Sequence, residues 1–229
     1  MKSSFFIAGT GTGVGKTIVT GYLTRYFFQQ NRSVITQKWV QTGYLEADHD
    51  ILTHDRICGR SSDRNEDRLP YRFRMPSSPH LAAKMERRAI DPKVIFDSLT
   101  RLQSQYEQII IEGTGGLMVP FTEELLQIDL IQHSRCPVVL VIANQLGAIN
   151  HAILSIEALQ SRKITILGLI FNQITSNEDT EILKENLSII NKITKCPIFG
   201  EFYFFDDKKN NIDQGLLIGQ ALEARLRCL

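Results

Sequence analysis

The chain has 229 residues, of which 43% are hydrophobic and 22% are charged, and its formal net charge is +1. These values are ordinary for a globular protein and exclude disordered and fibrous classes, and a chain so close to neutral has no overall field to attract nucleic acid or an anionic membrane. The four cysteines are widely spaced and no apolar run is long enough to cross a bilayer. We therefore expect a cytoplasmic protein without disulfides, membrane spans or nucleic-acid partners.

Short β-branched runs alternate with amphipathic patterns along the chain. Strands are expected at residues 4–9, 33–37, 108–112, 138–143, 164–172 and 198–200, and helices at residues 16–29, 92–106, 126–133, 150–162, 178–192 and 214–227. Several strands, such as VVLVIA at residues 138–143, are apolar without alternation, as expected when helices cover both faces of a parallel sheet. We predict an α/β fold of the P-loop NTPase type, with residues 1–229 forming a single doubly wound domain whose mostly parallel sheet is flanked by helices.

The first expected strand runs into the loop GTGTGVGKT at residues 9–17, which leads directly into the first expected helix. Glycines let backbone N–H groups approach an anion, and the helix N-terminus adds its dipole. The usual phosphate-binding loop would begin with a glycine at position 10, which is Thr10 here, and Gly9 lies one residue earlier. The sequence thus predicts a variant nucleoside triphosphate site, in which Lys16 reaches the β- and γ-phosphates and the Thr17 hydroxyl holds Mg²⁺.

A second lysine follows the second expected strand, in KWVQTG at residues 38–43. Ligands of open α/β sheets lie beyond the carboxyl ends of the strands, so Lys38 and Thr42 are expected to face the same crevice as the phosphate loop. A lysine there indicates a second negative charge besides ATP, although a solvated lysine at a strand end fits the spacing equally well. Trp39 is interpreted as a packing residue.

Two acidic residues are candidates for holding the metal. Glu112 ends the expected strand at residues 108–112, where P-loop enzymes commonly carry a metal-binding carboxylate, and GTGG at residues 113–116 would let the backbone approach a phosphate or a second substrate. Asp50 lies in EADHDILTHD, where a charged surface loop offers several carboxylates and the histidines have no firm metal-ligand spacing.

The stretch from residue 43 to residue 90 is the least regular. Its arginines recur at positions 56, 60, 64, 68 and 72, which would suit a basic stripe for a polyanion. Acidic residues interleave with them, and Gly59 and Pro70 interrupt a continuous helix, so we interpret the stretch as a solvated surface excursion. PSSPH at residues 76–80 is interpreted as a turn into a helix. LGAINHAIL at residues 146–154 is interpreted as a helix start, where free N–H groups could also bind a carboxylate.

Together these motifs resemble those of the dethiobiotin synthetase family. The family pattern G-T-x-T-x-V-G-K-T matches residues 9–17, K-P-V-x-S/T-G matches residues 38–43 with Trp39 in place of proline, and P-x-S-P-H matches residues 76–80. E-G-A-G-G matches residues 112–116 with Thr114 for alanine, L-G-x-I-N-H matches residues 146–151, and a late strand ends at Asn172 as in the family. The family's G-E-I-P is Gly-Glu-Phe-Tyr at residues 200–203. The likeness runs in order through almost the whole chain.

The resemblance implies an ATP-dependent cyclo-ligase of biotin synthesis. Its partners would be 7,8-diaminopelargonic acid, CO₂ or bicarbonate, and ATP, with Mg²⁺ as the cofactor. One amine of the substrate would take up CO₂ as a carbamate, which attacks the γ-phosphate to give a carbamic-phosphoric anhydride. The neighbouring amine would then close the ring of dethiobiotin and expel phosphate. Lys16 and Lys38 would be catalytic, because they neutralise the charge that a carbamate concentrates beside a triphosphate.

The resemblance also assigns the remaining site residues by position. The magnesium ligands would be Thr17, Asp50 and Glu112. The nucleotide would be held by Gly13, Val14, Gly15, Lys16, Thr17, Ile18, Asp50, Glu112, Gly113, Thr114, Gly115, Asn172, Gln173, Tyr203, Phe204 and Phe205. The diamine or its carbamate would contact Thr12 and Thr42. The carboxylate tail of the substrate would be received across a homodimer interface by Gly147, Ala148, Ile149 and Asn150.

Two other kinds of protein share this architecture. One is an ATP-dependent amidation domain related to corrin-ring synthetases, which would carry a glutaminase half and lack the motif around Lys38. The other is a nucleotide-switched partner protein of the partition-ATPase kind. That kind places a signature lysine five residues before the P-loop lysine, and the corresponding residue here is Gly11.

Overall fold

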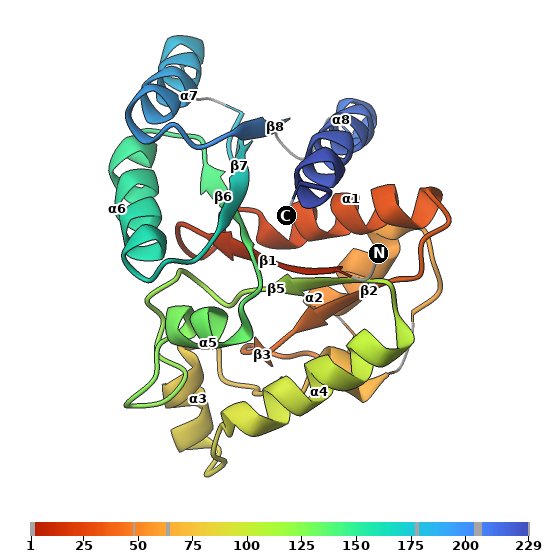
Figure 1. Cartoon of the computed structure of the whole chain (residues 1–229). Coiled ribbons are helices and arrows are strands. Elements are labelled where there is room, and N and C mark those ends of the chain that lie inside the picture. The colour runs from red at the N-terminus through yellow and green to blue at the C-terminus, as the bar shows by residue number, and fades with distance from the viewer. Residues whose placement is uncertain (1–2, 48, 63–64, 177–178, 204–207, 229) are drawn as a thin grey trace.

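The computed structural model describes residues 3–47, 49–62, 65–176, 179–203 and 208–228. Within them a six-stranded sheet has the strand order β2-β5-β1-β6-β7-β8 (Figure 1). All neighbouring pairs run parallel, which confirms the predicted doubly wound α/β fold. The strands are β1 (Ser3–Gly9), β2 (Val34–Lys38), β5 (Gln108–Glu112), β6 (Val138–Ala143), β7 (Ile166–Asn172) and β8 (Ile198–Phe202).

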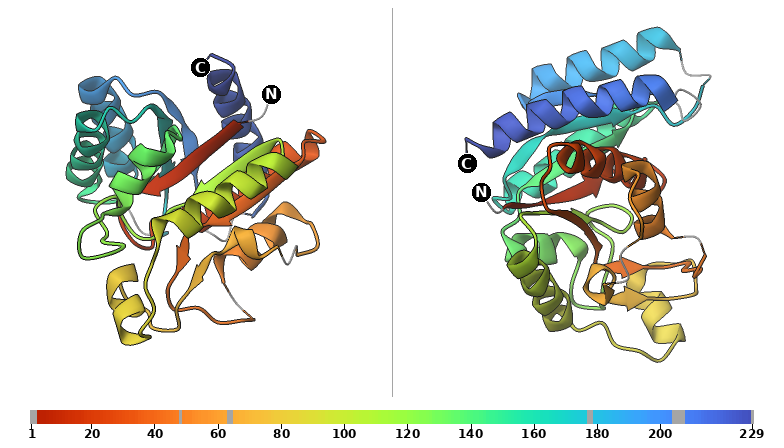
Figure 2. Two further views of the ribbon diagram at one scale, coloured as in Figure 1. Left: turned by 60° about the horizontal axis from the view of Figure 1, so that its bottom comes forward. Right: turned by 90° about the vertical axis from the view of Figure 1, so that its right-hand side faces the viewer.

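Helices cover both faces of this sheet, because side chains alternate along each strand. Phe6 and Ala8 of β1 enter one apolar cluster, and Phe5 and Ile7 enter the other. The first cluster is closed by α3 (Pro79–Met85), α4 (Pro92–Gln105), α5 (Gln127–Ser134), α6 (Ala148–Ser161) and α7 (Thr180–Thr194). The second is closed by α1 (Lys16–Gln29) and α8 (Lys208–Leu226), which lie side by side in both Figure 1 and Figure 2.

The predicted elements agree with the observed ones to within a few residues at most ends. The helix at residues 16–29 and the strands at residues 108–112 and 138–143 have the predicted bounds. The largest difference is α8, which begins at Lys208 rather than at residue 214. Among the described residues, no helix is both long enough and apolar enough to span a membrane.

The prediction of a solvated excursion between residues 43 and 90 was wrong for its central part. This part contains α2 (Asp50–Cys58), the short helix η1 (Glu66–Arg68) and β4 (Tyr71–Arg72). β4 pairs with β3 (Val40–Gln41), which precedes the stretch, in a separate two-stranded sheet. Arg68 is 1% exposed and donates hydrogen bonds of 2.8 Å to both carboxylate oxygens of Asp55. A third bond of 2.8 Å joins Arg68 to the Thr36 hydroxyl on β2. A buried ion pair therefore fastens α2 and η1 to the main sheet.

Of the other arginines in this series, Arg56 is exposed as predicted, whereas Arg60 and Arg72 are half-buried and Arg60 donates to Asp55 at 2.8 Å. Arg64 lies outside the described residues. Gly59 ends α2 in a left-handed conformation with φ of 81°, as its interruption of the helix pattern indicated. Trp39 is a packing residue, as predicted: it is 1% exposed, and its ring centroid lies 4.8 Å from that of Phe6 and 6.0 Å from that of Phe96.

Candidate functional site

The phosphate loop leaves β1 and turns sharply into α1 at Gly15. This residue has φ of 95°, and a Cβ added there would lie 2.1 Å from Nδ2 of Asn172, so another residue type would strain the backbone and displace the Asn172 side chain. Asn172, at the end of β7, donates a hydrogen bond of 3.1 Å to the carbonyl of Val14. The Asn172 side chain, which the family resemblance assigns to the nucleotide, therefore supports the loop backbone in this structure.

Lys16 lies across the loop that it follows. Its ammonium group donates a hydrogen bond of 2.8 Å to the carbonyl of Gly11, and the residue is only 6% exposed. Desolvation lowers the pKa of Lys16 from 10.5 to about 8. A bound polyphosphate would raise the pKa of Lys16 again, because it would give the buried ammonium group an anionic partner.

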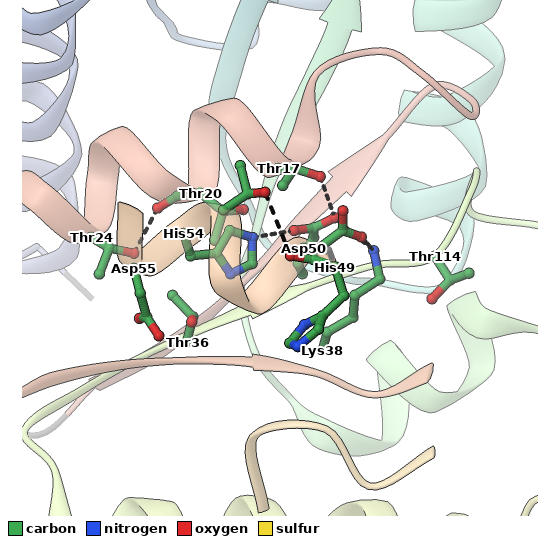
Figure 3. Close-up of polar contacts among 12 residues, drawn as sticks. Thr17, Thr20, Thr24, Thr36, Lys38, His49, Asp50, His54, Asp55 and Thr114 are labelled. Carbon is green, nitrogen blue, oxygen red and sulfur yellow. Dashed lines mark hydrogen bonds and ion pairs between the residues drawn. The ribbon is translucent and has the colours of Figure 1, made fainter. Parts of the chain in front are cut away.

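Lys38 belongs to the polar cluster drawn in Figure 3, in which Thr17, Asp50 and His54 are also labelled. Glu112 is part of the same cluster through its contacts with Lys38 and Thr17. Lys38 and Glu112 are paired in register at the carboxyl ends of β2 and β5. The Lys38 ammonium donates to Glu112 Oε1 at 2.8 Å and also to Asp50. The Thr17 hydroxyl donates to the same Oε1 of Glu112 at 3.1 Å. The three residues predicted to hold magnesium are thus brought together around the second lysine.

The charges of this cluster stabilise one another. Burial by itself would lower the pKa of Lys38, but the carboxylates of Glu112 and Asp50 outweigh it and raise that pKa. Burial would likewise raise the pKa of Glu112, but Lys38 and His54 hold it well below its usual range. Lys38 is therefore an ammonium group and Glu112 a carboxylate at neutral pH.

The donor chemistry of the cluster fits Mg²⁺. Two carboxylates and one hydroxyl are the hard oxygen ligands that this ion prefers. Both carboxylates already contact a cation, the Lys38 ammonium, and the Thr17 hydroxyl is hydrogen-bonded to Glu112. Within the described part of the chain, no group of three or more His, Cys, Asp or Glu residues is arranged to hold a metal. Because the Lys38 ammonium already contacts both carboxylates, a magnesium ion bound by them would share them with Lys38 or displace its ammonium group.

His54 also belongs to the cluster, and the sequence analysis missed its role. It is fully buried on α2, and its Nε2 lies 2.5 Å from Oε2 of Glu112. His54 follows Asp50 by one helical turn, so both side chains lie on the same face of α2. The spacing would have indicated this face if residues 50–58 had been predicted as a helix.

The GTGG loop after β5 lies against the phosphate loop. A Cβ placed on Gly116 would be 3.6 Å from Cα of Gly11, and a Cβ placed on Gly115 would be 3.4 Å from the Thr12 hydroxyl oxygen. Gln127, at the start of α5, accepts from the Thr114 N–H at 2.6 Å and donates to the Gly116 carbonyl at 3.0 Å. This buried glutamine, which no sequence motif indicated, fixes the loop backbone at Thr114 and Gly116.

The residues predicted to bind the second substrate lie in several places. Thr12 is exposed beside the GTGG loop, and Thr42 is half-buried next to Gly43, whose N–H donates to the carbonyl of Met75 at 3.1 Å. Residues 147–150 form the start of α6, which begins after Gly147 with φ of 90°. Gly147 and Asn150 are exposed, Ile149 is half-buried and Ala148 is buried. Within the part of the chain that the structure describes, no hydrogen bond or ion pair joins this segment to Lys38.

The predicted base-binding residues follow β7 and β8. The Gln173 N–H donates to the carbonyl of Phe202 at 2.9 Å, and Tyr203 is 40% exposed. The buried side chain of Asn211 accepts from the Tyr203 N–H at 2.9 Å and donates to the Tyr203 carbonyl at 3.1 Å. Phe204 and Phe205 lie outside the described residues. Asn211 was not identified from the sequence, because only the folded chain places α8 beside β8.

Comparison with known proteins identifies relatives over most of the chain. A family model described as an AAA domain matches residues 3–207. An ATP-dependent dethiobiotin synthetase BioD 2 from Haemophilus influenzae is 43% identical over 175 residues, which cover 75% of this chain and 92% of the relative. An ATP-dependent dethiobiotin synthetase BioD from Thermodesulfovibrio yellowstonii is 34% identical over 236 residues, which cover 98% of both chains.

Solved structures of other proteins share the fold. A plasmid partition protein from Borrelia burgdorferi has a TM-score of 0.62 at 15% identity, covering 98% of this chain and 100% of that chain. A MinC:MinD cell division protein complex from Aquifex aeolicus has a TM-score of 0.59 at 18% identity, covering 99% of this chain and 95% of that chain. At such low identities the likeness concerns the arrangement of helices and strands alone.

Proposed function

The chain belongs to the dethiobiotin synthetase family, and we propose that it joins 7,8-diaminopelargonic acid and CO₂ into dethiobiotin at the expense of ATP, through a carbamate and a carbamic-phosphoric anhydride. The observation that carries the proposal is the position of Lys38. Its ammonium group lies 2.8 Å from Glu112, within the cluster that also contains Thr17 of the phosphate-loop helix. A cation at this position would face the terminal phosphate of a nucleotide held by that loop.

Lys38 would act by turning its ammonium group from the carboxylates toward the substrate. In this structure its ammonium group is shared by Glu112 and Asp50. A carbamate beside the γ-phosphate would be a new anionic partner, and Lys38 would then stabilise the charge that develops as the carbamate oxygen attacks. Lys16 would hold the phosphates from the loop side. Phosphoryl transfer depends mainly on such positioning and electrostatics, so no separate acid or base is needed for this step.

Magnesium would be held by Thr17, Asp50 and Glu112. When bound, the ion would neutralise phosphate charge and orient the terminal phosphoryl group. The chain's own contribution is to keep these oxygen atoms converged: Glu112 is buried at the end of β5, and Asp50 is held at the start of α2. The assignment is supported by the chemistry of the donors, by the contact of both carboxylates with Lys38, and by the hydrogen bond of the Thr17 hydroxyl to Glu112.

The nucleotide base would lie near Asn172, Gln173 and Tyr203. The diamine would lie at Thr12 and Thr42, and its carboxylate tail would meet residues 147–150 of a second subunit. The helix start at Gly147 supports the last assignment, because the first N–H groups of a helix lack partners within the helix and can bind an anion, and Gly147 and Asn150 are exposed there. A cytoplasmic location belongs to the same proposal and is supported by the free thiols of Cys58, Cys136, Cys196 and Cys228.

The experiment is a single incubation of the full chain with ATP, Mg²⁺, isotope-labelled bicarbonate and 7,8-diaminopelargonate. We expect mass spectrometry to find dethiobiotin that carries the label, with ADP and phosphate formed in equal amounts. ATP hydrolysis without labelled dethiobiotin would contradict the proposal. It would favour a nucleotide-switched partner protein if a second protein stimulated the hydrolysis.

A further inference from the structure

Glu112 divides its two carboxylate oxygens between opposite sides of the site. Oε1 accepts from the Lys38 ammonium at 2.8 Å and from the Thr17 hydroxyl at 3.1 Å. Oε2 lies 2.5 Å from Nε2 of His54. The carboxylate plane is therefore fixed by partners on β2 and α1 on one side and on α2 on the other.

The hydrogen of the His54–Glu112 bond belongs to the histidine. Oε1 of Glu112 already accepts from the Lys38 ammonium and from the Thr17 hydroxyl, so the group is paired as a carboxylate, and an ionised carboxylate can only accept hydrogen bonds. Nε2 of His54 must then carry the hydrogen. Among the described residues, Nδ1 of His54 is buried without a hydrogen-bond partner. The hydrogen bond from Nε2 to Glu112 therefore orients the imidazole ring.

Packing alone does not explain a histidine at this position. A buried polar atom without a partner costs about 1–3 kcal/mol, and an apolar side chain of similar size would fill the same space without that cost. The histidine instead holds the Glu112 carboxylate in place, because its Nε2–H donates a charge-assisted hydrogen bond to one carboxylate oxygen, Oε2. The rest of α2 is held rigidly, since Asp55 next to His54 is fastened to Arg68.

We propose that His54 is a positioning residue for Glu112: it holds Oε2, so that Oε1 stays directed at Thr17 and the phosphate loop when Lys38 leaves the carboxylate for the substrate. The inference rests on the proposed function, in which Glu112 helps to hold magnesium beside ATP. Without His54, departure of the Lys38 ammonium would leave the buried carboxylate with the Thr17 hydroxyl as its one remaining partner in the described cluster.

Three variants separate orientation from packing. His54→Leu fills the volume and removes the donor. His54→Gln keeps a donor at the same number of bonds from the backbone as Nε2, and His54→Asn keeps an amide that is one bond too short. The probe is Mn²⁺, titrated by paramagnetic resonance into full-length protein with a non-hydrolysable ATP analogue. We expect the leucine and asparagine variants to bind Mn²⁺ about tenfold more weakly or worse, and the glutamine variant to stay within about threefold of the original protein.

Fluorescence of Trp39 reports whether each variant folds, and the asparagine variant decides the comparison if the leucine variant does not fold. Glu112→Gln is measured in parallel to test the proposed function separately. Unchanged Mn²⁺ affinity in Glu112→Gln would refute the metal role of Glu112 itself. If Glu112→Gln loses affinity while His54→Leu and His54→Asn do not, or if His54→Gln loses as much as they do, the proposed role of His54 is overturned.

Discussion

Lys16 and Lys38 are both buried lysines, but their surroundings move their pKa values in opposite directions. Lys38 lies between carboxylates, which raise its pKa against the effect of burial. Lys16 is held mainly by a neutral carbonyl, so desolvation lowers its pKa to about 8. The free protein therefore presents a permanent charge beside Glu112 and a titratable charge in the phosphate loop.

This difference predicts a pH dependence of nucleotide binding. Above pH 8, Lys16 of the free folded protein loses its proton while an unfolded lysine keeps it up to about pH 10.5. The unfolded state then binds more protons, so the free energy of unfolding contributed by Lys16 rises with pH in this window. ATP needs the charged form, and its affinity should fall about tenfold between about pH 7 and about pH 9.

Calorimetry in buffers of different ionisation enthalpy measures this effect, since ATP binding near pH 9 should take up a proton. The control is Lys16→Arg, whose guanidinium stays charged, so its affinity for ATP should not change over this range. Equal pH dependence in the two proteins would show that Lys16 is not the titrating group.

At the scale of elements, the placement of α2 depends on a charge pair. Arg68 joins Asp55 of α2 to Thr36 of β2, and all three side chains are buried. Arg68→Met removes two charge-assisted hydrogen bonds from the buried Asp55 carboxylate, to which the Arg60 guanidinium still donates at 2.8 Å, so this substitution should lower the free energy of unfolding by about 3 kcal/mol. Urea unfolding followed by the fluorescence of Trp39, the only tryptophan, measures this change.

The matched control is Arg101→Met on α4. Arg101 pairs with Asp67, but its side chain is 55% exposed, so its removal should cost less than about 1 kcal/mol. Similar unfolding midpoints for the Arg68 and Arg101 variants would contradict the structural role assigned to the buried pair.

Some elements of the fold and the site could be predicted from the sequence, and others could not. The phosphate loop, the strand ending at Glu112 and most helices are local patterns, and their spacing alone predicted them. Lys38 and Glu112 could be placed together because the ends of parallel strands meet at one edge of a sheet. His54 and Arg68 depend instead on how α2 packs against β2, which no periodicity in residues 43–90 indicated. Gln127 and Asn211 were missed because their contacts depend on where α5 and α8 pack in the folded chain.

At the scale of the whole molecule, the fold does not distinguish the proposed ligase from nucleotide-switched partition proteins. This chain shares its arrangement of helices and strands with a plasmid partition protein from Borrelia burgdorferi. The distinction comes from particular residues: a glycine at position 11, and a lysine at position 38 that contacts Glu112.

The proposed substrate site requires a second subunit, which gives a prediction for α6. Leu154 lies on this helix next to the segment 147–150 and is 56% exposed. If two copies meet there, sedimentation velocity should find a dimer, and Leu154→Asp should dissociate it and raise the KM for the diamine at least about tenfold without changing ATP affinity. Leu217→Asp, on α8 and also 56% exposed, is the control and should remain dimeric. A fully active monomer would contradict this arrangement.

We infer that the Lys38 ammonium stabilises the carbamate and the phosphoryl group during ring closure and is not needed to hold ATP. The most direct test compares dethiobiotin formation with the affinity for ATP in Lys38→Met, with Lys93→Met on the exposed side of α4 as the control. We predict that Lys38→Met lowers the rate of dethiobiotin formation at least about a hundredfold while its Kd for ATP stays within about threefold, and that Lys93→Met changes neither. Equal loss of ATP affinity and activity, or full activity without Lys38, would contradict the account.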